Sequence, residues 1–503
     1  MKIEPQEMVK ILKDKIARFK DRIDIAKTGI VLRVGDGIAQ IYGLKEAVSS
    51  EMVLFKDNIQ GMVLNLEEEV VGVCIFGDDY AIKEGDEVRL TGKVLEVPVG
   101  EDVMGRVIDP LGNPLDGGAP LAAKESRPVE VKAPGVAQRE PVNTPVETGL
   151  KAIDAMVPIG RGQRELVIGD RQTGKTALLI DTIINQKNKG VHCFYVAIGQ
   201  KNSTLAYLID TLKKNNCMGY STVVVASASS PTPLQYIAPY AATSMAEYFR
   251  DSGRDALIIY DDLSKHAACY RELSLLLRRP PGREAYPGDI FYTHSRLLER
   301  ACKLSKKHGG GSLTALPIVE TQAQDVTTYI PTNLISITDG QIYLDTDLFH
   351  EGIRPAINVG LSVSRVGGAA QFKAMKRVAG MLRLDLAQFR EVEAFTQLGT
   401  ELDKETKSQI ERGRRLIEVI KQDQFQPYSL SQEFLIIYAA TRGLLDDIPI
   451  KDIRRFEQEF LEFSKNTYPK VCETIEKNKD FDEALEAKIK EMVAVFKEKF
   501  IFV

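Results

Sequence analysis

The chain of 503 residues contains no Trp, only five His and only six Cys. None of the cysteines forms a CxxC pair, so we expect buried reduced thiols rather than a disulfide framework or a zinc site. The histidines show no metal-ligand spacing. We therefore expect His266 and His294 to be interior residues with hydrogen-bond partners.

The sequence also lacks long apolar runs. No segment approaches about 20 uninterrupted apolar residues, so no membrane-spanning helix is predicted. The N-terminus has neither an apolar signal core nor an Arg/Ser-rich, acid-poor transit segment. A formal net charge of −4 argues against a general nucleic-acid or anionic-membrane surface. The length favours about three domains.

The N-terminal third changes character twice. Residues 1–25 carry a helical stripe of apolar positions, typical either of an ordinary packed helix or of a docking helix for a partner. Residues 26–95 hold short β segments punctuated by glycine, with a tight-hairpin signal at Asp36-Gly37. Six or so short strands in this length predict a small closed β-barrel.

Residues 96–370 are expected to form an α/β domain. A Pro- and Gly-rich connecting segment comes first, and buried strands then alternate with helical patterns, which predicts a parallel sheet. The five predicted strands are Leu166–Ile168, Phe194–Ile198, Val223–Ala226, Leu257–Tyr260 and Leu313–Ile318. Leu334–Thr338 and Gln341–Leu344, joined by Asp339-Gly340, predict a closing hairpin. Residues 371–503 carry helical periodicity, so we expect a C-terminal α-helical domain.

A phosphate-binding motif is the most specific signal in the sequence. Gly169–Thr176 follows the apolar run Leu166–Ile168 and precedes a helical run. Strand, glycine loop and helix in this order are the context that a P-loop requires. Loop N–H groups and the helix N-terminus bind phosphate oxygens. Lys175 would reach the β- and γ-phosphates, and the Thr176 hydroxyl would ligate Mg²⁺.

Two residues bear on catalysis. Asp261 ends the apolar strand Leu257–Tyr260, where an aspartate holds Mg²⁺ in P-loop proteins, usually through water; a strand-ending Asp can also simply cap a helix. Gln200 follows the run Phe194–Ile198 after Gly199, near the place where P-loop ATPases commonly carry a glutamate. An amide is a poor general base, although a Gln can still position water.

Two further segments allow more than one interpretation. Arg365 lies between small residues and glycines, so it is either solvated or an arginine finger. The Pro/Gly-rich loop of residues 278–289 is either a plain surface loop or a shaped surface that meets a partner.

Taken together, these motifs resemble those of the alpha subunits of F-type rotary ATP synthases, over nearly the whole sequence. The motifs are Gly169–Thr176, Val196–Gln200, Tyr260–Lys265, Leu277–Asp289, Ser336–Gly340 and Gly360–Gly367. The resemblance implies a β-barrel, a central RecA-like P-loop domain and a helical domain. It also implies a complex that makes ATP from ADP and phosphate with a transmembrane ion gradient, in which this subunit holds MgATP without turning it over.

The resemblance assigns residues as well. Arg365 corresponds to an arginine finger in a beta subunit's catalytic site, with Ser362 in the same interface motif, and Thr176 and Asp261 correspond to the Mg²⁺ partners. The ATP/ADP site would comprise Gly169, Asp170, Arg171, Gln172, Thr173, Gly174, Lys175, Thr176, Ala177 and Gln200, with an adenine pocket of Phe349, Arg354, Pro355, Gln422 and Gln424.

The implied partners are beta subunits in an alternating hexamer, a central gamma rotor met by the loop Pro280–Gly288, and a delta or peripheral-stalk subunit at the N-terminal helix. No nucleic acid is implied, and membrane association runs only through the complex. The expected place is the cytoplasmic face of a bacterial plasma membrane or, alternatively, an organelle inner or thylakoid membrane. The competing interpretation is a self-sufficient hexameric P-loop ATPase, such as a helicase or secretion ATPase.

Overall fold

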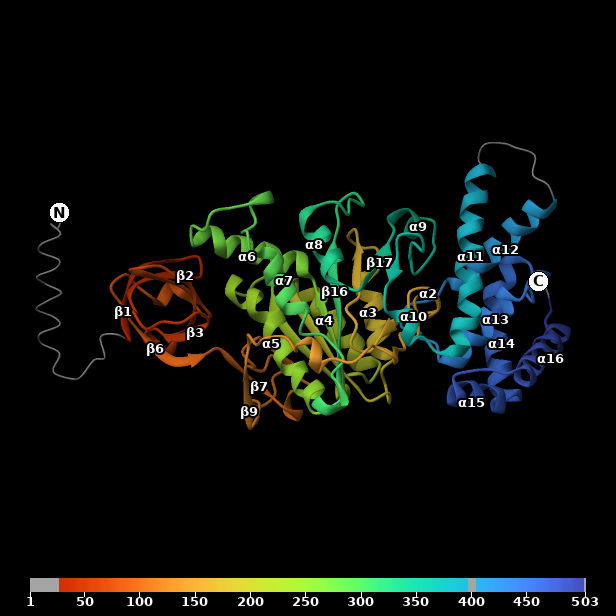
Figure 1. The fold of residues 1–503 in the computed structure, drawn as a ribbon, viewed down its shortest axis with the longest axis horizontal. Helices are drawn as coiled ribbons and strands as arrows, with labels where there is room; N and C mark the ends of the chain where they lie inside the picture. Colours follow the sequence, from red (N-terminus) through yellow and green to blue (C-terminus); the bar gives the residue numbers. More distant parts are fainter. Residues whose placement is uncertain (1–26, 397–403, 502–503) are drawn as a thin grey trace, which may run out of the picture.

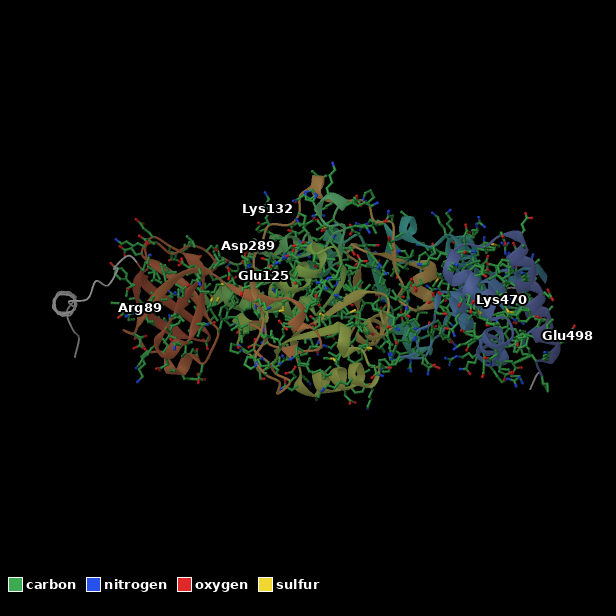
Figure 2. The ribbon with its side chains drawn as sticks, turned by 90° about the horizontal axis from the view of Figure 1, so that it is seen from below. Arg89, Glu125, Lys132, Asp289, Lys470 and Glu498 are labelled. Atoms are coloured by element: carbon green, nitrogen blue, oxygen red, sulfur yellow. The ribbon has the colours of Figure 1, made fainter. Side chains whose placement is uncertain are left out.

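Three bodies lie in a row along the longest axis of the molecule (Figure 1). The computed structural model describes residues 27–396 and 404–501. A β-barrel comes first, a central α/β domain second and a helical domain third, as the sequence predicts. The predicted N-terminal helix of residues 1–25 lies outside the described residues. Figure 2 labels charged side chains on each body: Arg89 on the barrel, Glu125, Lys132 and Asp289 on the central domain, and Lys470 and Glu498 on the helical domain.

The barrel is closed by six antiparallel strands in the order β1-β2-β5-β4-β3-β6. Asp36 and Gly37 both have positive φ, 54° and 76°, which is the turn that a two-residue hairpin needs. The predicted barrel and hairpin are both confirmed. The strands are β1 (Thr28–Gly35), β2 (Ile38–Gly43), β3 (Glu51–Leu54), β4 (Gln60–Leu66), β5 (Val70–Ile75) and β6 (Glu87–Val94).

The segment that follows the barrel is more structured than a plain connection. β7 (Glu96–Val99) pairs with β9 (Glu125–Pro128), and β10 (Pro145–Val146) pairs with β11 (Ile159–Gly160). β8 (Val107–Ile108) pairs with a strand of the central sheet and forms its outer edge. The segment therefore belongs physically to the central domain.

The central sheet has the order β18-β17-β12-β16-β15-β13-β14-β8 and is parallel except for β18. Each of the five strands predicted between residues 166 and 318 is present, within one or a few residues. The strands are β12 (Leu166–Gly169), β13 (Val191–Gln200), β14 (Ser221–Ser227), β15 (Asp255–Asp261), β16 (Ser312–Glu320), β17 (Gly340–Leu344) and β18 (Val363–Ser364).

Helices cover both faces of this sheet, because its strands are apolar on both sides. Val167 and Leu257 point into one core, and their neighbours Leu166 and Ile258 point into the other. The first core is covered by α2 (Lys151–Met156), α3 (Lys175–Ile184) and α4 (Asn202–Lys214). The second is covered by α5 (Thr232–Asp251), α6 (Leu263–Leu276), α7 (Ile290–Leu298) and α8 (Tyr329–Ile337).

The predicted closing hairpin is wrong. Leu334–Ile337 belongs to helix α8, whose buried residues Ile330, Leu334 and Ile337 recur at helical spacing. β17 then pairs in parallel with β12, and a parallel pair cannot be joined by a two-residue turn. The antiparallel partner of β17 is β18, which follows later in the sequence.

The helical domain shares its core with the first face of the sheet, so the two bodies are packed together. A buried ion pair between Lys151 of α2 and Glu457 of α14 adds a polar tie. The helices after α9 (Thr346–His350) are α10 (Gly367–Ala370), α11 (Lys373–Thr396), α12 (Lys404–Ile420), α13 (Leu430–Thr441), α14 (Ile453–Thr467), α15 (Pro469–Asn478) and α16 (Glu483–Lys499).

The cysteines and the two histidines singled out in the sequence have the predicted environments. All six cysteines are free thiols; five are buried and Cys472 is half-buried. His266 and His294 are buried, with ring nitrogens 3.2 Å apart, and His266 also lies 2.9 Å from the carbonyl of Tyr236. Within residues 27–396 and 404–501, no helix is long and apolar enough to cross a membrane.

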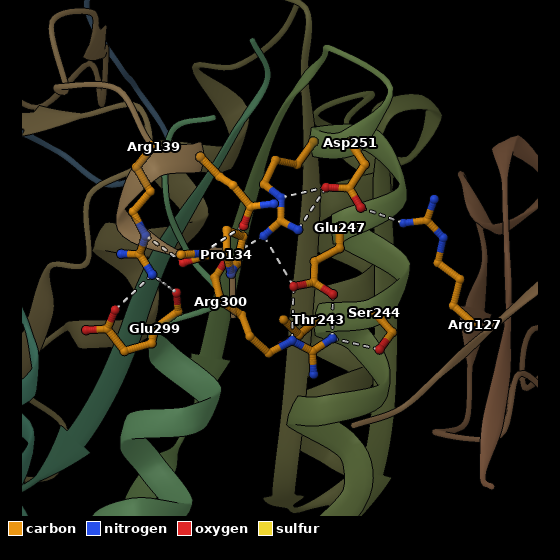
Figure 3. Close-up of polar contacts among 12 residues, drawn as sticks. Arg127, Pro134, Arg139, Thr243, Ser244, Glu247, Asp251, Glu299 and Arg300 are labelled. Atoms are coloured by element: carbon orange, nitrogen blue, oxygen red, sulfur yellow. Dashed lines mark hydrogen bonds and ion pairs between the residues drawn. The ribbon is translucent and has the colours of Figure 1, made fainter. Parts of the chain in front are cut away.

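A buried ionic network fixes α5 to the segment after α7 (Figure 3). Arg300 donates to both carboxylate oxygens of Glu247, at 3.0 and 2.6 Å, and Arg250 donates to the same carboxylate at 3.2 Å. Arg300 also donates to Ser244 and to the carbonyl of Val129. Because α5 packs on β13 and β15, this network supports the two strands that end at Gln200 and Asp261.

Candidate nucleotide-binding site

The glycine loop follows β12 directly, at the carboxyl edge of the sheet. Gly174 has a φ of 96° at the N-cap of α3, a conformation that favours glycine. A Cβ on Gly169 would come within 2.5 Å of the Leu344 carbonyl oxygen, so that position has no room for a side chain. The loop thus presents its N–H groups and the N-terminus of a ten-residue helix together.

Lys175 lies folded into this loop. Its ammonium donates to the carbonyl of Gly169 at 2.8 Å and also to that of Asp170. Burial lowers the pKa of Lys175, while the nearby carboxylates, Glu320 first among them, raise it. The Asp170 carboxylate accepts hydrogen bonds from Thr321 (2.6 Å) and from the Gln324 N–H (3.0 Å), which anchors the loop. The Lys175 ammonium therefore lies against the backbone of the glycine loop.

Thr176 and Asp261 meet as the sequence predicts for a Mg²⁺ site. The Thr176 hydroxyl donates to the Asp261 carboxylate at 3.0 Å. Burial raises the pKa of Asp261, and hydrogen bonds from Tyr195 and Thr176 together with Lys265 oppose that rise. A hydroxyl and a carboxylate are hard oxygen donors, and Mg²⁺ needs only one or two of them besides phosphate oxygens and water. These residues fit the ion.

Gln200 lies beside the same carboxylate rather than facing open space. Its amide donates to Asp261 Oδ1 at 2.8 Å. This geometry uses the amide as a donor that fixes Asp261, and an amide cannot take up a proton at neutral pH. A second carboxylate nearby, Glu320, was missed from the sequence. Glu320 forms an ion pair with the exposed Arg171 at 3.0 Å. The sequence signal that could have identified it is an apolar strand that ends in an acidic residue.

The five residues assigned to an adenine pocket come together. Phe349, Arg354, Pro355, Gln422 and Gln424 line one pocket with the start of α3. The Arg354 guanidinium lies 4.5 Å from the Phe349 ring centroid.

Gln422 contributes to this pocket as part of its wall. Its amide oxygen accepts from the Lys151 N–H (3.1 Å), and its amide nitrogen donates to the carbonyls of Gly149 (2.7 Å) and Gln426 (3.0 Å). The amide is thus occupied by the protein, which leaves Gln424 as the polar side chain of the pair facing the pocket. Asp181 also lines the pocket and was missed, because nothing local marks it.

Arg365 lies at the opposite edge of the sheet from the P-loop. Ser364 pairs with Gly340 at the beginning of β17, whereas Gly169 pairs with Leu344 at its end. Four residues of strand span about 13 Å. The exposed Arg365 rests on the end of α8, donating to the carbonyls of Thr338 and Ile335. It therefore lies away from the subunit's own phosphate site.

Ser362 faces inward. Its side chain is buried and its hydroxyl accepts a hydrogen bond from the Tyr343 N–H at 2.9 Å. This hydrogen bond ties the segment that carries Arg365 to β17 of the same subunit.

Comparison with known proteins agrees with this architecture. Three family models match consecutive parts of the sequence: the beta-barrel domain of the ATP synthase alpha/beta family at residues 24–92, the nucleotide-binding domain of that family at 149–364, and the C-terminal domain of the ATP synthase alpha/beta chains at 371–496. The protein is also 60% identical over 498 residues to the ATP synthase subunit alpha of Desulfovibrio desulfuricans, with 99% of each sequence covered.

The chain belongs to the ATP synthase alpha/beta family. Its similarity to a subunit alpha over nearly the full length makes it an alpha subunit of ATP synthase, part of a complex that makes or hydrolyses ATP. The nucleotide-binding domain of this family contains both the P-loop and most of the pocket described above. An ATP synthase subunit functions within a multisubunit complex that includes beta subunits.

Proposed function

We propose that this alpha subunit holds MgATP without hydrolysing it and supplies Arg365 to a catalytic site on a neighbouring beta subunit. The observation that carries the first half is the hydrogen bond from the Gln200 amide to Asp261. Where a hydrolytic site needs a carboxylate to polarise water, this site has a donor that is already occupied. The P-loop is therefore suited to binding rather than to turnover.

Within this site each group has a defined task. The P-loop N–H groups and Lys175 would bind the phosphates, and Thr176 with Asp261 would hold Mg²⁺, the latter through water. Mg²⁺ neutralises phosphate charge when bound. The adenine would enter the pocket of Phe349, Arg354, Pro355 and Gln424, with Gln422 as its wall.

The second half of the proposal rests on the position of Arg365. An exposed guanidinium at the edge opposite the P-loop is far from the subunit's own phosphate site, which supports a role toward a phosphate held by another subunit. A finger of this kind stabilises the charge that develops on the transferred phosphoryl group. Ser362 would position it.

We further propose the assembly that the family relationship suggests. Beta subunits would alternate with this subunit, the loop Pro280–Gly288 would face a gamma rotor, and residues 1–25 would dock a delta or peripheral-stalk subunit. The complex would lie on the cytoplasmic face of a bacterial membrane and couple ATP synthesis to an ion gradient. We take the domain limits as 26–95, 96–370 and 371–503.

An ATPase assay of the purified subunit, alone and then with a beta subunit, tests this function. We expect nucleotide binding without turnover by the isolated alpha subunit, and turnover once beta is present. Steady hydrolysis by the isolated subunit would instead favour a self-sufficient hexameric ATPase.

Replacing Lys175 with alanine should weaken MgATP binding by the subunit by roughly 10- to 100-fold, because a charge-assisted contact with phosphate is lost. Equilibrium titration with a fluorescent ATP analogue would measure this. Lys214→Ala, which removes an exposed ammonium on α4, serves as the control and should bind normally. In the assembled complex, Lys175→Ala should retain bond cleavage on beta; its complete loss would contradict a binding role.

A further inference from the structure

One buried carboxylate in the adenine pocket has no place in the function proposed so far. Asp181 lies in α3, the helix that begins at the P-loop, and its side chain is 3% exposed. It lines the same pocket as Arg354, Pro355 and Gln424. No phosphate or metal role is open to it, because those groups bind at the N-terminal end of α3, more than a turn away.

One oxygen of the Asp181 carboxylate is hydrogen-bonded to the protein backbone. Oδ1 accepts a hydrogen bond from the Phe425 N–H at 2.7 Å. Phe425 has a φ of 63°, which is unfavourable for a residue other than glycine and is kept where the surroundings require it. The backbone next to Gln424 is therefore held in a conformation that aims its N–H at this carboxylate.

The second oxygen of Asp181 accepts no hydrogen bond from the residues that the structure describes, 27–396 and 404–501. A link between α3 and Phe425 alone would need one acceptor and no charge, and Asn would provide it. Burial instead raises the pKa of Asp181 to about 7, so the ionised carboxylate is costly at this position. A ligand that donates a hydrogen bond to the second oxygen would offset that cost.

We propose that Asp181 distinguishes purine bases at their six-position, by accepting a hydrogen bond from the exocyclic amino group of adenine. This inference rests on the proposed function, in which the base occupies this pocket. Guanine and hypoxanthine carry a carbonyl oxygen at the same position. That oxygen would face the ionised Asp181 carboxylate with two acceptors and no proton between them, which disfavours 6-oxopurines at pH values above 7.

The substitution Asp181→Asn provides a sharp test because it keeps the tie to Phe425. The amide oxygen would accept from the Phe425 N–H, which turns the NH₂ group toward the base. That group repels an amino substituent and donates to a carbonyl. The wild-type subunit should bind ATP about tenfold or more tightly than inosine triphosphate, and Asp181→Asn should abolish or reverse this preference.

The affinities of the full-length subunit for ATP and inosine triphosphate, measured by calorimetry at about pH 8.5, where Asp181 is ionised, test this role of Asp181. Asp154→Asn is the matched control, because burial also raises the pKa of Asp154, to about 6, while the residue lies outside this pocket. It should keep the wild-type ratio. The wild-type subunit should bind purine riboside triphosphate, which lacks a six-substituent, with intermediate affinity.

The possible outcomes separate the role of Asp181 from nucleotide binding itself. Equal affinities of the wild-type subunit for ATP and inosine triphosphate, or an unchanged ratio in a folded Asp181→Asn variant, would overturn the role of Asp181 and leave nucleotide binding intact. Failure of the wild-type subunit to bind either nucleotide would overturn both the proposed function and this inference.

Discussion

Replacing Arg365 with alanine should slow ATP turnover by the assembled complex roughly 10³-fold or more, since removal of an arginine finger costs that much in phosphoryl transfer. The side chain lies at the sheet edge opposite the P-loop, so nucleotide binding by the alpha subunit itself should be almost unchanged. Steady-state ATPase assays of a reconstituted alpha–beta–gamma complex would measure the first effect, and ligand titration of the free subunit the second.

Arg377→Ala is the matched control, because it removes a guanidinium that is also partly exposed and that pairs with Asp480 of the helical domain. It should leave turnover within a few-fold of wild type. Arg365→Lys keeps a positive charge but loses the planar fork, so it should recover only part of the rate. Wild-type turnover in the Arg365→Ala complex would remove the finger assignment.

The second large effect concerns stability. Glu247→Gln should lower the unfolding free energy by about 3–5 kcal/mol, because it leaves the buried guanidinium of Arg300 without its counter-charge. Arg300 is 1% exposed and Glu247 is 3% exposed, so water cannot replace the lost carboxylate. The protein has no Trp, so urea unfolding is best followed by far-UV circular dichroism, with attention to the transition of the central domain.

Glu299→Gln is the comparison for this variant. Glu299 also pairs with arginine, but its side chain is 43% exposed, and pairs of that kind contribute about 0–1 kcal/mol. A similar loss in both variants would mean that burial is not what makes the Glu247 pair important.

Local pattern was enough for the phosphate end of the site. The P-loop needs glycines, Lys175 and Thr176 in consecutive order, and a buried strand must end at Asp261, so the sequence alone determines these neighbours. The β-barrel was equally accessible, because Asp36-Gly37 and alternating apolar residues encode a hairpin locally. These features require no knowledge of distant contacts.

Local sequence pattern did not predict the features that depend on contacts between residues far apart in the sequence. Leu334–Ile337 is rich in apolar and β-branched residues and resembles a strand, yet its burial against the central domain selects a helix. The pairing of Asp181 with Phe425 joins residues 244 positions apart. The hydrogen bonds between the Gln422 amide and the backbone of Gly149 and Lys151 likewise depend on how the helical domain packs on the central domain. The periodicity of apolar residues in the sequence does not predict that packing.

Closure of the N-terminal barrel sets how that end of the molecule can associate with its neighbours. Within residues 28–94 every one of the six strands has two paired neighbours, so no row of free backbone N–H and C=O groups remains along an edge. A neighbouring subunit cannot add a strand there. If these barrels assemble into a ring, side chains and loops would have to make the contacts between them, which would disfavour open-ended growth by strand addition.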